Sequence, residues 1–342
     1  MQVQESRSYY NFINSIRSKS SKVSYCGELR RYLRHYNILS VDQLLDLPDK
    51  EPKIIDYILQ QKGFKSRQLT INTLKKFYEM NDVILNWKKI TCYMGEEQKL
   101  NEDRCYTREE ILRLLNVCDL RMKMIVLLMA SSGMRIGALP TLCLGQIANA
   151  TVTVYAGTKD KYITFITPEC KAVIDSYLAY RVRSGEKLGP GSPLIRKQFD
   201  INDLEQVREK SEPISLHTLS KGLENYLIKA GLRTIDHTAN KRKEIARAHG
   251  FRKFFTTQLV NSKVNPEIRE MLLGHSIGLA GAYYKPTEDE MLEEFMKAVD
   301  NLTINEENRL KKKVVVLQKR NDNLDRLLDR LDKLEKEIGI KI

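Results

Sequence analysis

Residue types that can act on a phosphodiester are concentrated between residues 248 and 284. This stretch contains a His-x-x-Arg pair, a Leu-Gly-His triplet and a tyrosine doublet. Arginine binds non-bridging phosphate oxygens in a bidentate manner without losing its charge, and histidine exchanges a proton near neutral pH. Tyrosine can act as a covalent nucleophile. The candidate residues are therefore His249, Arg252, His275, Tyr283 and Tyr284.

This set lacks a second arginine and an acid for the leaving oxygen, and candidates for both lie upstream. Arg135 follows Gly133 at the end of an apolar run, where a buried helix that stops at a glycine can aim a side chain rigidly. Lys159 and Lys161 lie in a turn-like segment, 156–161. A lysine in a turn is usually solvated, so position alone identifies neither of them as the acid.

The elements that would position these residues are mostly helices. Capping boxes at Thr107 and Thr287 each predict the start of a helix, and the apolar run 124–129 predicts a central buried helix. Alternating residues over 151–155 and 162–166 predict a β hairpin. Further helices are expected over 167–180, 215–230 and 266–273. The expected fold is mainly α with a small antiparallel β hairpin or sheet, which is an α+β fold.

The N-terminal block, residues 1–95, is predicted to form short helices rich in Lys and Arg. Pro48 and Pro52 are expected to interrupt them. Such a block fits either a plain helical bundle with a charged surface or a DNA clamp, in which lysines contact phosphates and helices enter a groove. The predicted helices cover residues 8–16, 24–36, 41–47, 54–60 and 66–87.

The rest of the chain divides into a linker over 96–106, a second domain over 107–300 and a C-terminal helix over 301–342. Residues 277–282 are small and are expected to form a flexible segment that presents the tyrosine doublet. In the tail, mostly apolar residues recur at alternating intervals of four and three positions. This spacing predicts either a coiled coil or a single amphipathic helix packed on its own domain. The heptad positions are Leu310, Val314, Leu317, Asn321, Leu324, Leu328, Leu331, Glu335 and Ile338.

Composition narrows the class of protein. A chain of 342 residues is long enough for two domains, and a net charge of +13 favours a polyanionic partner such as nucleic acid over a merely solvated basic surface. No apolar run reaches 18 residues and the N-terminus lacks a signal peptide, so we expect a cytoplasmic protein without membrane contact. The scattered cysteines predict buried thiols and no disulfide frame or zinc site: Cys26, Cys92, Cys105, Cys118, Cys143 and Cys170.

The ordered motifs resemble the tyrosine recombinase, or phage integrase, family, and more narrowly its archaeal members. The resemblance covers roughly residues 107–300 and more loosely the N-terminal block. Arg135, in Gly-Met-Arg-Ile-Gly-Ala-Leu, matches the first arginine motif of the family. His249 and Arg252 match its His-x-x-Arg box, and His275 matches its Leu-Gly-His box.

The resemblance also implies a choice among the open candidates. The nucleophile usually stands nine positions after the Leu-Gly-His histidine, which selects Tyr284 and leaves Tyr283 as the alternative. The family's lysine lies at the tip of a hairpin, which fits Lys159 best and keeps Lys161 open. One departure is Ala138, because the family commonly has Glu or Asp at this position, where the acid supports the site from behind.

The function implied by the resemblance is site-specific recombination of double-stranded DNA, without a metal, ATP or another cofactor. Tyr284 would form a 3′-phosphotyrosyl link while Arg135 and Arg252 clamp the phosphate. Lys159 would protonate the 5′-oxygen, His249 would accept or relay the tyrosine proton, and His275 would donate to a phosphate oxygen. The family implies four protomers on two DNA duplexes and a nucleoid-associated location. The alternatives are a non-catalytic DNA-binding protein of the same fold and a type IB topoisomerase.

Overall fold

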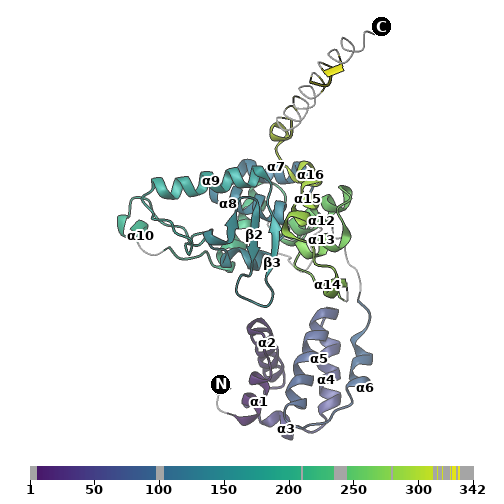
Figure 1. Ribbon diagram of the computed structural model, residues 1–342. Helices are drawn as coiled ribbons and strands as arrows, with labels where there is room; N and C mark the ends of the chain where they lie inside the picture. Colours follow the sequence, from purple (N-terminus) through teal and green to yellow (C-terminus); the bar gives the residue numbers. More distant parts are fainter. Residues whose placement is uncertain are drawn as a thin grey trace. The chain divides into compact units, whose positions relative to one another are not determined.

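The computed structural model describes residues 6–97, 104–208, 211–234, 245–278 and 280–310, and in the tail residues 314, 318, 324, 326–328, 330 and 331. The chain forms two compact units, Met1–Leu100 and Asn101–Ile342 (Figure 1). The boundary between them falls within the segment predicted as a linker, 96–106. Within the described residues, none of the helices combines the length and the apolar character that crossing a bilayer requires.

The first unit is a helical bundle around one apolar core, which Phe12, Tyr32, Ile58, Leu74 and Phe77 fill with fully buried side chains. Helices α2 and α5 pack against each other, and α1 packs on α5. The helices are α1 (Arg7–Asn14), α2 (Lys19–His35), α3 (Gln43–Asp46), α4 (Lys50–Gln60), α5 (Phe64–Glu79) and α6 (Trp87–Thr91), followed by a 3-10 turn at Cys92–Met94.

Two of the predictions for this unit are wrong. The expected helix over 66–87 is two helices, because α5 ends at Glu79 and α6 begins only at Trp87. Between them, Asp82 adopts a left-handed φ of 58°, which no helix can continue through. Pro52 does not interrupt a helix, since it lies in the first turn of α4, where the missing N–H removes no hydrogen bond of the helix.

The second unit is mainly helical with a three-stranded antiparallel sheet, so the predicted fold class is confirmed. The sheet has the order β1-β2-β3, with β1 at Ile147–Ala148, β2 at Thr151–Val154 and β3 at Tyr162–Phe165. The short strand β1 was not predicted, because two residues cannot show an alternating pattern. The helices are α7 (Arg108–Val117), α8 (Leu120–Ser132), α9 (Pro168–Arg183), α10 (Leu204–Arg208), α11 (Leu216–Lys229), α12 (His249–Asn261), α13 (Pro266–Leu272), α14 (Ala280–Tyr283), α15 (Glu288–Met296) and α16 (Val299–Leu302).

Helix α8 is the central buried helix that the apolar run predicts. Residues 124–130 are all at most 4% exposed, and the helix packs against α9 and α12. Asp119 caps its N-terminus by accepting a hydrogen bond from the Met122 amide over 2.7 Å. Gly133 ends it with a left-handed φ of 62°. The predicted capping boxes at Thr107–Glu110 and Thr287–Glu290 are likewise confirmed.

The start of the tail is held by one carboxylate, that of Glu169 on α9. It accepts hydrogen bonds from the amides of Ile304 over 2.8 Å and Asn305 over 2.9 Å. Beyond this anchor, the described heptad residues Leu310, Val314, Leu324, Leu328 and Leu331 are helical and 50–55% exposed. The other predicted heptad positions, Leu317, Asn321, Glu335 and Ile338, lie outside the described residues. The coiled coil therefore stays a prediction.

All six cysteines are free thiols, as expected. The prediction that they are buried is wrong for most of them, because only Cys118 and Cys170 are buried and Cys92 is exposed. Burial raises the pKa of the Cys118 and Cys170 thiols to about 12. These two thiols therefore stay protonated at neutral pH and act as small core side chains.

Candidate active site

Arg252 is a buried arginine that joins three segments of the second unit. It lies in the first turn of α12 and its side chain is only 5% exposed. Its Nη1 donates to the Gly133 carbonyl over 2.8 Å, and its Nη2 donates to the Leu273 carbonyl over 2.6 Å. Burial lowers the pKa of this guanidinium, and the nearby charge of Arg135 adds to the effect. Arginine titrates so high that Arg252 still keeps its charge at neutral pH.

His275 contacts the same arginine from the end of α13. Its Nε2 atom lies 2.7 Å from Arg252 Nη2, and its Nδ1 atom lies 2.6 Å from Glu270 Oε2. The hydrogen bond with His275 lowers the pKa of the Glu270 carboxyl; burial opposes this, and Arg269 adds to it. Glu270 was missed in the sequence, because a lone acid within a helix carries no recognisable signal.

Gly274 sets the position of His275 through a close approach to β3. It has a left-handed φ of 64°, and a Cβ atom added there would lie 2.5 Å from Tyr162 Cδ1. The Tyr162 ring thus packs against the backbone of the Leu-Gly-His motif. Burial raises the pKa of Tyr162, while the charges of Arg252 and Arg135 oppose this. Because glycine has no side chain, the end of α13 packs closely on β3. This packing places His275 beside the hairpin whose turn carries Lys159 and Lys161.

A pocket of about 830 Å³ lies between the hairpin and the end of α13. Arg135, Lys159, Lys161 and His275 all line it. These residues come from three separate segments: the end of α8, the β2–β3 turn and the end of α13. Both lysines are exposed, and both line the pocket, so its geometry favours neither as the acid. The pocket is rich in cationic side chains, and the buried Arg252 contacts its wall at His275.

The remaining candidates do not line this pocket. His249 is exposed at the first position of α12. Tyr283, the last residue of α14, is 89% exposed, and Tyr284 just after it is 38% exposed. The segment predicted as flexible thus runs into a short helix, with Leu279 outside the described residues. The structure brings the arginines, the lysines and His275 together, and neither tyrosine is among the residues that line their pocket.

Ala138 is fully buried in the 3-10 helix Ile136–Thr141 and brings no carboxylate to the site. Among the described residues, the carboxylate that contacts His275 comes from Glu270 on α13. No group of three or more His, Cys, Asp or Glu side chains in this part of the chain is placed to hold a metal ion.

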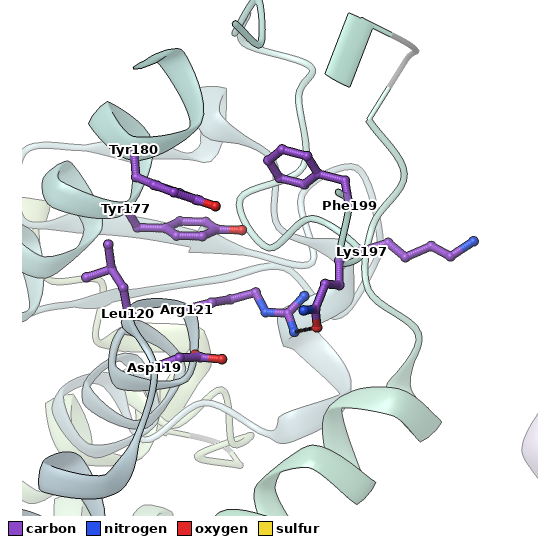
Figure 2. Close-up of a pocket in the computed structure, with 8 residues that line it drawn as sticks. Asp119, Leu120, Arg121, Tyr177, Tyr180, Lys197 and Phe199 are labelled. Atoms are coloured by element: carbon purple, nitrogen blue, oxygen red, sulfur yellow. Dashed lines mark hydrogen bonds between the residues drawn. The ribbon is translucent and has the colours of Figure 1, made fainter. Parts of the chain in front are cut away.

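A second, smaller pocket of about 180 Å³ lies at the start of α8 (Figure 2). Tyr177 and Tyr180 form one side and Phe199 lies across from them. Arg121 donates to the Gln198 side chain over 3.1 Å and to the Arg196 carbonyl over 3.2 Å, so its guanidinium is already engaged. None of the candidate residues lines this pocket, and the candidate active site is therefore the larger, cationic one.

Comparisons with known proteins agree with this fold. The chain is similar to a lambda integrase fragment bound to DNA (15% identity, TM-score 0.54, 82% of this chain and 91% of that chain). It is also similar to a lambda integrase tetramer bound to a Holliday junction (18%, 0.53, 81% and 75%). A third similar structure is the Tn1549 transposon integrase with transposon right-end DNA (15%, 0.51, 80% and 98%). At these identities the likeness shows the fold alone.

A search of curated protein sequences gave no match. The model of the phage integrase family matches residues 104–290, which is more than half of the chain and includes every candidate site residue. The archaeal subgroup stays a prediction. The match shows that this chain belongs to the phage integrase family and is a tyrosine site-specific recombinase.

Proposed function

We propose that this recombinase cuts and rejoins double-stranded DNA through a covalent 3′-phosphotyrosyl intermediate. The observation that supports this most is the convergence of Arg135, Lys159, Lys161 and His275 on one pocket, with Arg252 held behind it. Cationic donors fixed in advance around one point stabilise the charge that develops on a phosphate in the transition state. The net charge of +13 provides the long-range attraction for DNA.

In the proposed reaction the two arginines bind the non-bridging oxygens of the scissile phosphate. Tyr284 attacks phosphorus, its proton passes to His249, and the bond to the 5′-oxygen breaks. Lys159 gives that oxygen its proton, with Lys161 as the alternative acid. The phosphotyrosyl ester conserves the energy of the broken bond, so rejoining needs no ATP. The arginines and the lysine supply the positive charge that a metal ion supplies in other enzymes, so the proposed reaction needs no metal.

The tyrosine must move for this reaction. Tyr284 does not line the pocket of the free chain, and the choice of Tyr284 over Tyr283 rests on its spacing from His275. Helix α14 is only four residues long, so little regular structure has to break when the segment shifts. We propose that bound DNA draws Tyr284 toward the phosphate held by Arg135 and Arg252.

The assembly proposed for this reaction follows the lambda integrase tetramer on a Holliday junction. Four protomers would hold two DNA duplexes, with residues 1–95 as a DNA-binding domain and 107–300 as the catalytic domain. The C-terminal helix would provide contacts between protomers through its exposed leucines. We propose a cytoplasmic, nucleoid-associated location, in keeping with this DNA substrate. The archaeal assignment rests on the resemblance of the sequence motifs alone.

The nucleophile can be tested with nicked duplexes that carry a randomised core. On cleavage, the short fragment that bears the free 5′-hydroxyl is lost, so the covalent adduct accumulates. Wild-type protein and Tyr283→Phe are expected to form an adduct that survives denaturing gel electrophoresis, and Tyr284→Phe is expected to form none. An adduct with Tyr284→Phe would move the nucleophile to Tyr283. The absence of an adduct with wild-type protein would favour the non-catalytic alternative.

Strand exchange separates recombination from a topoisomerase activity. Duplexes selected in the adduct assay, placed twice in one supercoiled plasmid, are expected to yield recombined circles. Relaxation of the plasmid without recombined products would instead support the type IB topoisomerase alternative.

A further inference from the structure

Two partners hold opposite edges of the His275 ring. Glu270 Oε2 lies 2.6 Å from Nδ1, and Arg252 Nη2 lies 2.7 Å from Nε2. A guanidinium has N–H donors and no acceptor, so Nε2 must accept the hydrogen bond from Arg252. The ring proton is therefore on Nδ1, where it is donated to the Glu270 carboxylate.

Glu270 is itself fixed in place. Its Oε1 atom accepts a hydrogen bond from Arg269 Nε over 3.1 Å, which leaves Oε2 for His275. The backbone joins the same two residues, since the His275 amide donates to the Glu270 carbonyl over 2.9 Å. The end of α13 thus holds the histidine at both its backbone and its ring, and both carboxylate oxygens are used.

We propose that Glu270 is a positioning residue for recombination, whose carboxylate selects the Nδ1–H tautomer of His275 and directs Nε2 at Arg252. The inference rests on the proposed function, in which His275 and Arg252 act on the same phosphate. The tautomer of a histidine is set by the hydrogen bond that its other nitrogen makes. Without an acceptor on the Nδ1 side, only the Arg252 hydrogen bond holds the ring. The ring is then free to rotate away from Arg252 and to carry its proton on Nε2.

This arrangement has a chemical consequence when a phosphate enters the pocket. A phosphate oxygen accepts the Arg252 Nη2–H that bonds His275 in the free chain, and the Nε2 lone pair of His275 is released. The Gly133 and Leu273 carbonyls keep the guanidinium in place. To donate to a non-bridging oxygen, Nε2 must then take one proton from solvent, while Nδ1–H stays bonded to Glu270. The resulting imidazolium lies between the phosphate and the Glu270 carboxylate, and both anions balance its charge.

The tautomer can be read directly in the free, full-length chain by nitrogen-15 NMR of labelled imidazoles. The sequence has five histidines, and a His275→Ala spectrum identifies the signals of interest. Wild-type protein and Glu270→Gln, which keeps an acceptor oxygen, are expected to show His275 protonated on Nδ1. Glu270→Ala is expected to shift the ring toward the Nε2–H form. A wild-type ring protonated on Nε2, or an unchanged tautomer in Glu270→Ala, would overturn the proposal.

Single-turnover cleavage of a selected nicked duplex provides the functional readout. Glu270→Ala is expected to slow adduct formation by about tenfold or more, with DNA affinity changed less than about twofold. Glu270→Gln should stay within about threefold of wild type, because it keeps the hydrogen bond. Equal slowing in Glu270→Gln and Glu270→Ala would overturn the tautomer role.

Glu267→Gln is the matched control on the same helix and is expected to behave as wild type. If Glu270→Ala fails to fold, Glu270→Leu, which fills the space but offers no acceptor, takes its place in both measurements with the same expected and contradicting results. The failure of wild-type protein to form any adduct would count against the proposed function alone, because the NMR measurement needs no DNA.

Discussion

Gly133 and Phe255 approach each other so closely that a Cβ atom at residue 133 would lie 2.3 Å from Phe255 Cδ1. Gly133 also has a left-handed φ of 62°, and its carbonyl accepts a hydrogen bond from Arg252 over 2.8 Å. The glycine that ends α8 is therefore required by its left-handed backbone and by its neighbour on α12, and its carbonyl anchors the buried arginine. This contact fixes the start of the segment that carries Arg135.

Gly133→Ala is predicted to destabilise the second unit by about 2 kcal/mol or more, through left-handed strain and the clash with Phe255. Gly231→Ala is the matched control, because Gly231 has a φ of 68° but a Cβ atom there would meet nothing within 4 Å. Denaturant unfolding should show only about 1 kcal/mol of loss for the control. Equal losses in the two variants would contradict the role given to Phe255.

Arg252→Lys is predicted to slow adduct formation by about a hundredfold or more. An ammonium cannot reproduce the planar fork that bonds Gly133 and Leu273 at once, so the charge loses its fixed position. DNA affinity should change little, because one buried charge is a small part of the total phosphate contact. Cleavage rates and binding curves measured on the same duplex check the prediction, and a parallel loss of affinity would contradict it.

The general acid can be identified with a duplex whose scissile 5′-oxygen is replaced by sulfur, since a thiolate leaves without needing a proton. If Lys159 is the acid, Lys159→Ala should cleave the normal duplex about a hundredfold more slowly but cleave the sulfur duplex nearly as wild type does. Lys161→Ala, on the same turn, should be slowed only modestly on either duplex. If the sulfur duplex restored cleavage by Lys161→Ala and not by Lys159→Ala, the general acid would be Lys161.

The buried ion cluster at the end of α9 is predicted to give the second unit an acid-sensitive stability. Glu186 bonds Arg181 over 2.6 Å and Arg196 over 3.1 Å, and all three side chains are at most 6% exposed. Burial alone would raise the pKa of Glu186, but the hydrogen bonds and charge of Arg181, with Ser211 and Arg196, lower it below 4.5.

A carboxyl whose pKa is lower in the folded than in the unfolded state stabilises the folded state at pH values above its unfolded-state pKa. This contribution is lost as the pH falls through the folded-state pKa. Unfolding experiments from pH 7 to pH 3 should show wild-type stability falling below about pH 4.5. Glu186→Gln should be less stable at pH 7 by about 3 kcal/mol, because it leaves two buried arginines without a counter-charge. The stability of this variant should also depend less on pH in the acid range. An equally steep acid loss in Glu186→Gln would assign the effect to other carboxyls.

Local motifs were predictable because they depend on residues within one or two helical turns. The capping boxes at Thr107 and Thr287, the buried run in α8 and the hairpin strands all follow from such short-range rules. The errors also have local causes. The break after Glu79 depends on a left-handed Asp82, and the apolar spacing around it does not reveal that conformation.

By itself, the sequence determined which residue types could act on a phosphodiester and in what order they stand. The tertiary structure decided that Arg135, both lysines and His275 share one pocket, that Arg252 is buried behind it and that Tyr284 lies outside it. It also showed that Glu270 contacts His275. These relations depend on how α8, α12, α13 and the hairpin pack together, and contacts between residues more than a hundred positions apart, such as Arg252 to Gly133, leave no periodic trace in the chain.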